Sequence, residues 1–523
     1  MRNRTDETAR RTEPLERAAR ALSLAGFVIY AVAAPHSIAG SWMGLSAAVA
    51  GWLVRAALTR RTGFRRTALD LPLWLFVGWT VLSCLLSAEP RESVPKLINV
   101  STFLVFYLAQ SILTRRSAVL VACVLVVSGV AGVLWGVGDL IVGRGVVVSA
   151  LAADSPLRAA TPLREGDAVW RVNGRRVASV EEIDNEIKQT PAGGRVNLSV
   201  ISRGEHVEWP GPTVTDEMRA AASPSGIEGG GRTHSFRASG WTRHYETFAE
   251  LLQIIAQLAL GFALAAWLRR EEAESSGATK RGREDKDTRA QMKDTRARLK
   301  GTHARTLVVL PAAAFVVLAA GIALTAMRTT LVAFAVGAAV VAWRAARGRQ
   351  RLVVVAVVAF VLGFGAVAVW RTRAGGALAL SDPSAGLRLQ VARVAAERVW
   401  LHPFFGHGMD AMHLHWNEWG FPGQDMLHAH STPLQLAFDR GLPALLFWLW
   451  LMYAFWRLAW RAERMWRETQ EAGAHGLALG LAGALAGFLA SSLVNYNFGD
   501  SEVALLVWWM MGVVVVLNEE KAT

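Results

Sequence analysis

The chain has 523 residues, enough for several soluble domains, but its composition excludes that organisation. Apolar residues make up 52% of it and charged residues 19%, whereas about a quarter of a typical soluble protein is charged. The formal net charge is +14, yet the basic residues stand between long apolar runs, which indicates membrane topology and not a nucleic-acid ligand. Both cysteines, Cys84 and Cys123, lie inside apolar runs, so neither a disulfide framework nor a zinc site is expected. A soluble enzyme and a DNA-binding domain are therefore excluded.

Apolar windows long enough to cross a bilayer recur along the whole chain. A span needs about 20 mostly apolar residues to cross the hydrocarbon core. The charged N-terminal stretch lacks a small-residue cleavage site, so we expect an uncleaved first helix and not a signal peptide. The fold class expected is an all-α polytopic membrane protein with about 12 transmembrane helices. The predicted spans are 21–36, 38–57, 71–88, 97–113, 118–142, 246–268, 305–326, 329–346, 352–370, 441–460, 475–494 and 502–518.

The orientation of the spans follows from the basic residues in the short loops. With the N-terminus inside, the short inside loops hold fifteen Lys and Arg residues, and the short outside loops hold only Arg91, Lys96 and Arg328. This asymmetry predicts a multi-pass protein of the cell inner membrane with both termini in the cytoplasm. The inside loops concerned are 55–66, 114–117, 344–351 and 457–467.

The predicted spans divide the chain into five parts. Both long loops, 143–245 and 371–440, are expected in the periplasm, and the charged segment 269–304 is expected to be a cytoplasmic, disordered or frayed-helical linker. The parts in chain order are spans 1–5 in 1–142, the first periplasmic loop, spans 6–9 with the charged linker in 246–370, the second periplasmic loop, and spans 10–12 in 441–523.

The first periplasmic loop contains a segment typical of a small folded module. Short β-type runs alternate with turn signals at Asn173-Gly174 and Gly193-Gly194, and a helix-like stretch covers 180–189. The order of these elements over about 154–209 resembles a small α+β PDZ-like domain, and many PDZ domains accept a peptide as an added strand. A folded spacer and a module that contacts a peptide or protein both remain open. The following residues, 210–235, are rich in Gly, Ser and Pro and are expected to be a linker.

Histidine is concentrated in the second periplasmic loop. Six of the twelve His residues of the chain fall within 402–443, including the pairs His413-x-His415 and His428-x-His430. A metal site is one interpretation, but residues i and i+2 of an extended segment point to opposite sides, and no Cys or carboxylate spacing completes a set. Acid–base chemistry is the other, because a neutral imidazole near pH 7 can take a proton from a hydroxyl group.

The same loop carries the pattern of a known family. Pro403-Phe404-Phe405-Gly406-His407-Gly408 and then His428-Ala429-His430-Ser431 resemble the signature of the O-antigen ligases. That pattern is His, then Asn, Ser or Gln, nine residues and Gly, and here it runs from His430 to Gly441. Ala444 replaces a second Gly that is frequent in the family. The PDZ-like insertion is not a usual part of it.

The resemblance implies a function and a set of site residues. O-antigen ligases are membrane glycosyltransferases, here expected to be GT-C-like, which move a glycan from a lipid diphosphate carrier. His430 is then the general base for an inverting, metal-independent transfer that uses no cofactor. The diphosphate and substrate would be bound by Arg237, Arg328, Arg388, Lys96 and His428. Arginine suits this role because its planar fork binds phosphate oxygens in pairs.

The implied partners are an undecaprenyl-diphosphate-linked glycan, a lipid A–core or other glycolipid acceptor, and membrane lipids, without nucleic acid. Transfer to a protein hydroxyl, as by a protein O-oligosaccharyltransferase, and extension of the glycan by an O-antigen polymerase remain alternatives. A twelve-span transporter is the alternative from another class. It is disfavoured because the spans show no two-fold repeat, and because Asp139 and Glu250, the intramembrane charges, lie near span ends.

Overall fold

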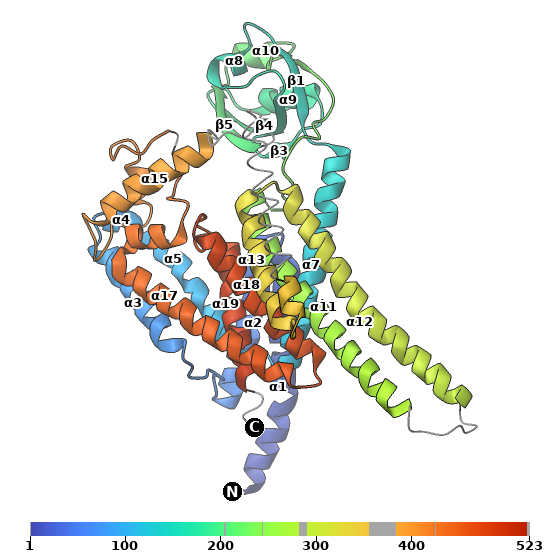
Figure 1. Cartoon of the computed structure of the whole chain (residues 1–523). Helices are drawn as coiled ribbons and strands as arrows, with labels where there is room; N and C mark the ends of the chain where they lie inside the picture. The colour runs from blue at the N-terminus through green and yellow to red at the C-terminus, as the bar shows by residue number, and fades with distance from the viewer. Residues whose placement is uncertain are drawn as a thin grey trace. The chain divides into compact units, whose positions relative to one another are not determined.

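The computed structural model describes residues 2–202, 205–242, 244–281, 290–354, 383–423 and 425–519 (Figure 1). The chain divides into two compact units. A helical unit comprises Met1–Val130, Ala249–Ile322 and Met327–Thr523, and a second unit comprises Ala131–Phe248 and Ala323–Ala326.

Long helices dominate the chain, and most of them are apolar, as the sequence predicts. They are α1 (Arg2–Ala33), α2 (Ile38–Thr59), α3 (Asp70–Leu86), α7 (Arg115–Val142), α11 (Tyr245–Arg281), α12 (Ala290–Leu324), α13 (Arg328–Ala345), α15 (Pro383–Val399), α17 (Thr432–Arg467), α18 (Ala472–Ser492) and α19 (Ser501–Glu519). Shorter helical segments are α4 (Pro90–Ser93), η1 (Val94–Lys96), α5 (Leu97–Val100), η2 (Ser101–Phe103), α6 (Leu104–Ile112) and α16 (Ala411–Leu414).

Within the described residues, eight helices are long and apolar enough to cross a membrane: α2, α7, α11, α12, α13, α17, α18 and α19. The polytopic helical fold is thereby confirmed. The helices α1 and α3 coincide with predicted spans but do not belong to these eight. The predicted span at 352–370 falls almost entirely outside the described residues. The count of twelve and the periplasmic placement of the loops stay predictions.

The predicted span at 97–113 is not one regular helix. It is divided into α5, the 3₁₀ turn η2 and α6. Ser101 Oγ donates a hydrogen bond to the carbonyl of Ile98 at 2.6 Å, and Thr102 Oγ1 donates one to that of Asn99 at 2.9 Å. Hydroxyl groups that bond to nearby carbonyls compete with the helical pattern, which explains the interruption.

Glycine allows close contacts between helices of the helical unit. A Cβ atom on Gly44 of α2 would lie 2.5 Å from the backbone nitrogen of Tyr30 in α1. A Cβ atom on Gly261 of α11 would lie 2.3 Å from the carbonyl oxygen of Gly476 in α18. Small residues at such crossings let helix backbones approach in a membrane, where dispersion contacts replace the hydrophobic effect as the driving force.

The second unit contains a six-stranded antiparallel sheet in the order β5-β4-β2-β1-β6, with β3 paired to β2. Its strands are β1 (Val146–Leu151), β2 (Ala168–Val172), β3 (Arg175–Arg176), β4 (Arg195–Ser202), β5 (Glu205–Thr213) and β6 (Ile227–Gly229). Its helices are α8 (Pro156–Ala160), α9 (Val180–Gln189) and α10 (Asp216–Ala220). The expected turn at Asn173-Gly174 joins β2 to β3, and both residues have positive φ, as a two-residue hairpin requires.

The sheet extends beyond the predicted module at 154–209. The strand β1 precedes that range, and the stretch 210–235, expected to be a linker, contains the end of β5, α10 and β6. Ile227 of β6 is buried in the same apolar cluster as Ile183 of α9 and Val200 of β4. Composition misleads here because the glycines and serines of 210–235 allow tight turns between elements that bury single apolar side chains.

The helix α17 is broken at Gly441. This residue has φ +82° and ψ 168°, and the amide of Leu442 donates a 2.7 Å hydrogen bond to the carbonyl of Pro403. A Cβ atom at Gly441 would lie 1.9 Å from the carbonyl oxygen of Phe404. Only glycine fits this position, both for its backbone conformation and for the space available. The glycine that closes the family pattern therefore marks a helix break.

We predict that Gly441→Ala destabilises the protein by more than about 3 kcal/mol, because a positive φ and a backbone clash act together. Thermal unfolding of the detergent-solubilised chain, followed by tryptophan fluorescence, measures the loss. Gly420→Ala is the matched control, since Gly420 also has positive φ (+73°) but a Cβ atom placed on it would meet nothing within 4 Å. It should cost only about 1 kcal/mol. Equal losses in the two variants would refute the role of the contact with Phe404.

Candidate functional site

The turn at 403–408 packs against the break in α17. The amide of His407 donates to the carbonyl of Phe438 at 2.8 Å, and that of Gly408 donates to the carbonyl of Asp439 at 3.0 Å. A Cβ atom at Gly406 would lie 2.5 Å from the amide nitrogen of Arg440. The two motifs of the resemblance are thus one structural unit, in which the turn satisfies carbonyls that the helix break leaves open.

Several of the clustered histidines hold this loop together. His407 lies between the rings of Phe438 and Trp419, with centroids at 4.6 and 4.8 Å, and its Nε2 is 2.9 Å from the carbonyl of Arg398. Burial lowers the pKa of His407 to about 4. His415 stacks on Trp419 and pairs with Glu418 at 2.6 Å and with Glu89 at 2.9 Å. The hydrogen bond with Glu418 raises the pKa of His415. The contacts of His407 and His415 therefore indicate a structural role for both side chains.

His428 and His430 stand next to each other at the start of α17. Their ring centroids are 4.4 Å apart, and the amide of His430 donates to Nδ1 of His428 at 3.4 Å. His430 has φ +49°, a conformation uncommon for a residue with a side chain and found most often where function or packing demands it. Burial, followed by the charges of His428 and Arg388, lowers the pKa of His430 to about 3. Burial and Arg388 likewise lower the pKa of His428 to about 4. Both imidazoles are therefore neutral near pH 7.

The predicted phosphate ligands lie at different distances from this pair. Arg388 on α15 is close enough for its charge to lower both histidine pKa values. Arg328 is the exposed first residue of α13, and its neighbour Thr329 accepts a 3.2 Å hydrogen bond from Asn495 Nδ2. The carbonyl of Asn495 in turn accepts from the amide of Thr432, two residues after His430. Arg328 and His430 are thus held by the same short loop between α18 and α19.

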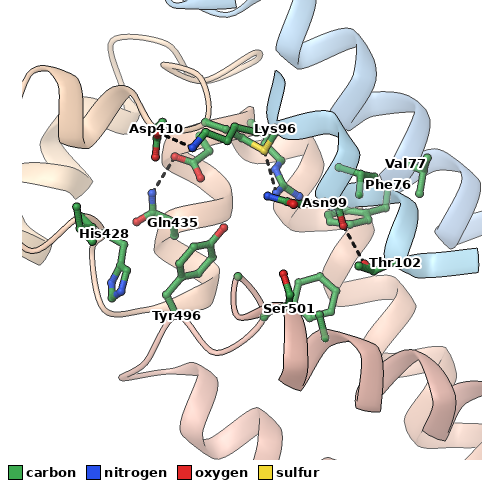
Figure 2. Close-up of a pocket in the computed structure, with 18 of the residues that line it drawn as sticks. Phe76, Val77, Lys96, Asn99, Thr102, Asp410, His428, Gln435, Tyr496 and Ser501 are labelled. Atoms are coloured by element: carbon green, nitrogen blue, oxygen red, sulfur yellow. Dashed lines mark hydrogen bonds and ion pairs between the residues drawn. The ribbon is translucent and has the colours of Figure 1, made fainter. Parts of the chain in front are cut away.

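A cavity of about 230 Å³ opens beside His428 (Figure 2). Lys96 lines it and pairs with Asp410 at 2.7 Å. Gln435 Nε2 donates to Asp439 at 2.8 Å, while Gln435 Oε1 accepts from the amide of Ala429 at 2.7 Å. Figure 2 shows Lys96 and Asp410 along the upper edge of the cavity and Gln435, His428 and Tyr496 along its left side. The structure thus brings two of the predicted binding residues, Lys96 and His428, to one cavity.

Arg440 also lines the cavity, and the sequence interpretation missed it. Its side chain is 9% exposed, its guanidinium lies 5.6 Å from the ring centroid of Phe76, and its Nε has no hydrogen-bond partner within the described residues. The residue falls among the nine spacer positions of the family pattern, which assign no role to it. One signal in the sequence could have identified Arg440. It forms a charged pair with Asp439 directly before a long apolar run, where charged residues usually have a function.

The carboxylate of Glu250 in α11 joins the elements around the histidine pair. It accepts hydrogen bonds from Thr330 at 3.0 Å, from Asn495 at 3.1 Å, from Asn497 at 3.3 Å and from Ser491. Asn497 Oδ1 accepts from the hydroxyl of Thr432 at 3.0 Å, so the network reaches the first residue of α17. These hydrogen bonds connect α11, α13, α17 and α18 at one end of the helical unit.

Arg237 belongs to the second unit. Its guanidinium lies 4.5 Å from the ring centroid of Tyr245, an arrangement in which a cation is stabilised by the aromatic face. Its role as a diphosphate ligand stays a prediction.

Metal ligands were sought among the described residues as well. In that part of the chain no group of three or more His, Cys, Asp or Glu side chains is arranged to hold a metal ion. His413 pairs with Asp425, and His428 contacts Tyr496 with ring centroids 5.6 Å apart.

We predict that Glu250→Leu destabilises the protein by about 3 kcal/mol or more, because it leaves several buried donors without an acceptor. Glu250→Gln should cost less, since an amide oxygen still accepts. Thermal unfolding in detergent measures both. Glu246→Gln, one turn earlier in α11 and only half-buried, is the control and should remain within about 0.5 kcal/mol of the parent protein. A Glu250→Leu variant as stable as this control would contradict the assigned role.

Comparison with known protein families supports the two resemblances. Residues 313–449 match the family model described as O-antigen ligase, which includes Arg328, Arg388, His428 and His430, and residues 128–201 match the PDZ domain model. No curated protein matches the chain. This is a membrane protein that carries an O-antigen ligase domain together with a PDZ domain, as the resemblances in its sequence predicted.

Proposed function

We propose that this protein is an inverting glycosyltransferase of the inner membrane, which transfers a glycan from an undecaprenyl-diphosphate carrier to a lipid A–core hydroxyl at the periplasmic face. The observation that carries the proposal is the uncharged pair His428 and His430 beside a cavity lined by Lys96 and Arg440, within reach of the charge of Arg388. A neutral base next to a group of cations suits a reaction in which a hydroxyl attacks and an anion leaves.

In this mechanism His430 is the general base. As the acceptor oxygen forms its bond to the anomeric carbon, its proton passes to the imidazole, and the bond from that carbon to the diphosphate oxygen breaks. The electron pair leaves with the diphosphate, and one displacement inverts the anomeric configuration. An imidazole with a pKa of about 3 is a weak base, so it takes the proton only when the new bond is well advanced and the hydroxyl has become acidic.

The main stabilisation must then come from charges around the leaving group. Arg328 and Arg388 of the helical unit are the proposed diphosphate ligands, with Lys96 contributing a point charge. Lys96 and Asp410 are each 42% exposed, so their ion pair is accessible to a competing anion. Fixed cations aimed at a developing negative charge provide electrostatic stabilisation without a metal ion.

For the acceptor, the proposal has a specific alternative. Transfer to a protein hydroxyl is favoured by one observation, the PDZ domain at 128–201, because such domains can bind extended peptides. Polymerisation of the lipid-linked glycan uses the same chemistry with another acceptor. A transporter receives no support from the O-antigen ligase match.

We predict that His430→Ala lowers glycan transfer by at least about 100-fold while the protein remains folded, since loss of a general base costs roughly 10²–10⁴-fold. The assay uses purified full chain, a lipid-diphosphate glycan and a lipid A–core acceptor, with EDTA present. His413→Ala is the control, because His413 is an exposed side chain of the same loop. Full activity of His430→Ala would remove the base from the mechanism, and loss of the parent activity in EDTA would indicate a metal.

We also predict an unusually low acid limb in the pH profile. Because the pKa of His430 is about 3, below the ordinary value of about 6.5, the imidazole stays neutral until the pH falls well below 5. The kcat/KM for transfer should therefore be insensitive to pH between about 5 and 7 and fall only below about pH 4. Arg388→Gln removes one cause of the lowered pKa and should move the acid limb upward. A limb near pH 6.5 in the parent protein would contradict the buried base.

A further inference from the structure

A second cavity of the helical unit has a different chemical character from the first. It measures about 770 Å³ and is lined by Arg20, Arg55, Arg61 and Arg65. One acidic residue, Glu16, and five serine or threonine residues also line this cavity. The two cavities share no lining residue. The first reaches the segment 97–112 at Asn99 and the second reaches it at Ser111, toward its other end.

The arginines of this cavity outnumber the carboxylates that pair with them. Arg55 Nη2 donates to the carbonyl of Ser111 at 3.1 Å, which fixes its guanidinium without supplying a negative charge. Arg20 lies 3.5 Å from Glu16, and Arg65 pairs with Glu519. Among the described residues, four guanidinium groups thus meet two carboxylates. A cavity with this excess, lined in addition by hydroxyl groups, suits a phosphate, because guanidinium and hydroxyl donors both bond to its oxygens.

The start of α7 adds to this field. The amide of Ala118 donates to the carbonyl of Thr114 at 2.8 Å, so the helix begins at the cavity wall formed by Thr114 and Ser117. The first turn of a 28-residue helix presents partial positive charge and favours an anion.

Apolar side chains at the cavity distinguish between a free phosphate ion and the phosphate of a lipid. Leu24, Ile112 and Leu113 line the cavity together with its arginines. Leu22, Val54 and Phe64, neighbours in sequence of lining residues, are 44%, 47% and 47% exposed. The cavity lies where α2 ends and α7 begins, two helices apolar enough to span a membrane, so these side chains stand at the ends of spans. A free phosphate ion makes no use of them, whereas acyl chains pack against them.

We propose that this cavity binds the headgroup of an anionic phospholipid, with the phosphodiester on Arg20, Arg55, Arg61 and Arg65 and the acyl chains along α1 and α2. Basic pockets between spanning helices are suited to anionic headgroups because the lipid supplies the missing negative charge. The site is independent of the proposed glycan transfer, since none of its residues belongs to the first cavity.

The chain offers a matched pair of variants for the test. Arg61 and Arg65 line the cavity, whereas their neighbours Arg60 and Arg66 do not. The double variants Arg61→Gln/Arg65→Gln and Arg60→Gln/Arg66→Gln remove the same charge from the same loop. Delipidated full chain in a neutral detergent is titrated with dioleoyl phosphatidylglycerol, dioleoyl phosphatidylethanolamine or glycerol 3-phosphate, and bound ligand is counted by native mass spectrometry.

The parent protein should bind phosphatidylglycerol in preference to the other two compounds. Each basic group near an anionic headgroup contributes roughly a fivefold change, so Arg61→Gln/Arg65→Gln should bind about 25-fold more weakly and Arg60→Gln/Arg66→Gln within about twofold of the parent. The single variants Arg61→Gln and Arg60→Gln repeat the comparison with the Arg65–Glu519 pair intact. Equal weakening in the two double variants would mean that the total charge of the loop, and not the cavity, governs binding, and would overturn the proposal. Equal binding of glycerol 3-phosphate, or of phosphatidylethanolamine, would overturn the assignment to an anionic lipid.

Discussion

A buried carboxylate on α11 is the interaction on which the arrangement of the histidine pair depends. Glu250 is 3% exposed and accepts hydrogen bonds from side chains on α13, on α18 and on the loop between α18 and α19. Taking a charge out of water is costly unless such donors surround it. Here the cost is offset by donors from elements far apart in the chain, and each of those elements is thereby fixed in position. The helix α13 begins with Arg328, and α17 begins two residues after His430. The hydrogen bonds of Glu250 connect the starts of both helices.

The neighbouring loop is also held in position by contacts between its side chains. Histidine and tryptophan are frequent in 402–430, and several of these side chains serve packing. His407 packs between Trp419 and Phe438, and His415 stacks on Trp419. The rigid turn that results supports the break in α17. His428 and His430 differ from these side chains in that they border a cavity or the cations beside it. The concentration of histidine therefore has two causes, of which only one concerns the chemistry.

Hydropathy and a short motif were sufficient to predict much of this molecule. The apolar runs locate the helices because a span must satisfy its backbone internally, and the family pattern selects His430 among twelve histidines. Glu250 could not be assigned from the sequence, since its position near a span end is compatible with simple exposure and its partners come from residues 330 and 491–497. Arg440 was missed because a spacing rule attaches no meaning to spacer positions. The strand at 227–229 was missed because one buried isoleucine gives no periodicity. Each omission concerns contacts between residues distant in sequence.

The break at Gly441 also has a mechanical meaning. The nine residues that precede it, 432–440, are bonded to the 403–408 turn and to the loop at 495–497 and are separated from the long apolar rod at 442–467 by a non-helical residue. The rod nevertheless starts from the same turn, because the amide of Leu442 donates a hydrogen bond to the carbonyl of Pro403. The 403–408 turn is therefore a common anchor for both parts of α17, the short segment that follows His430 and the long apolar helix.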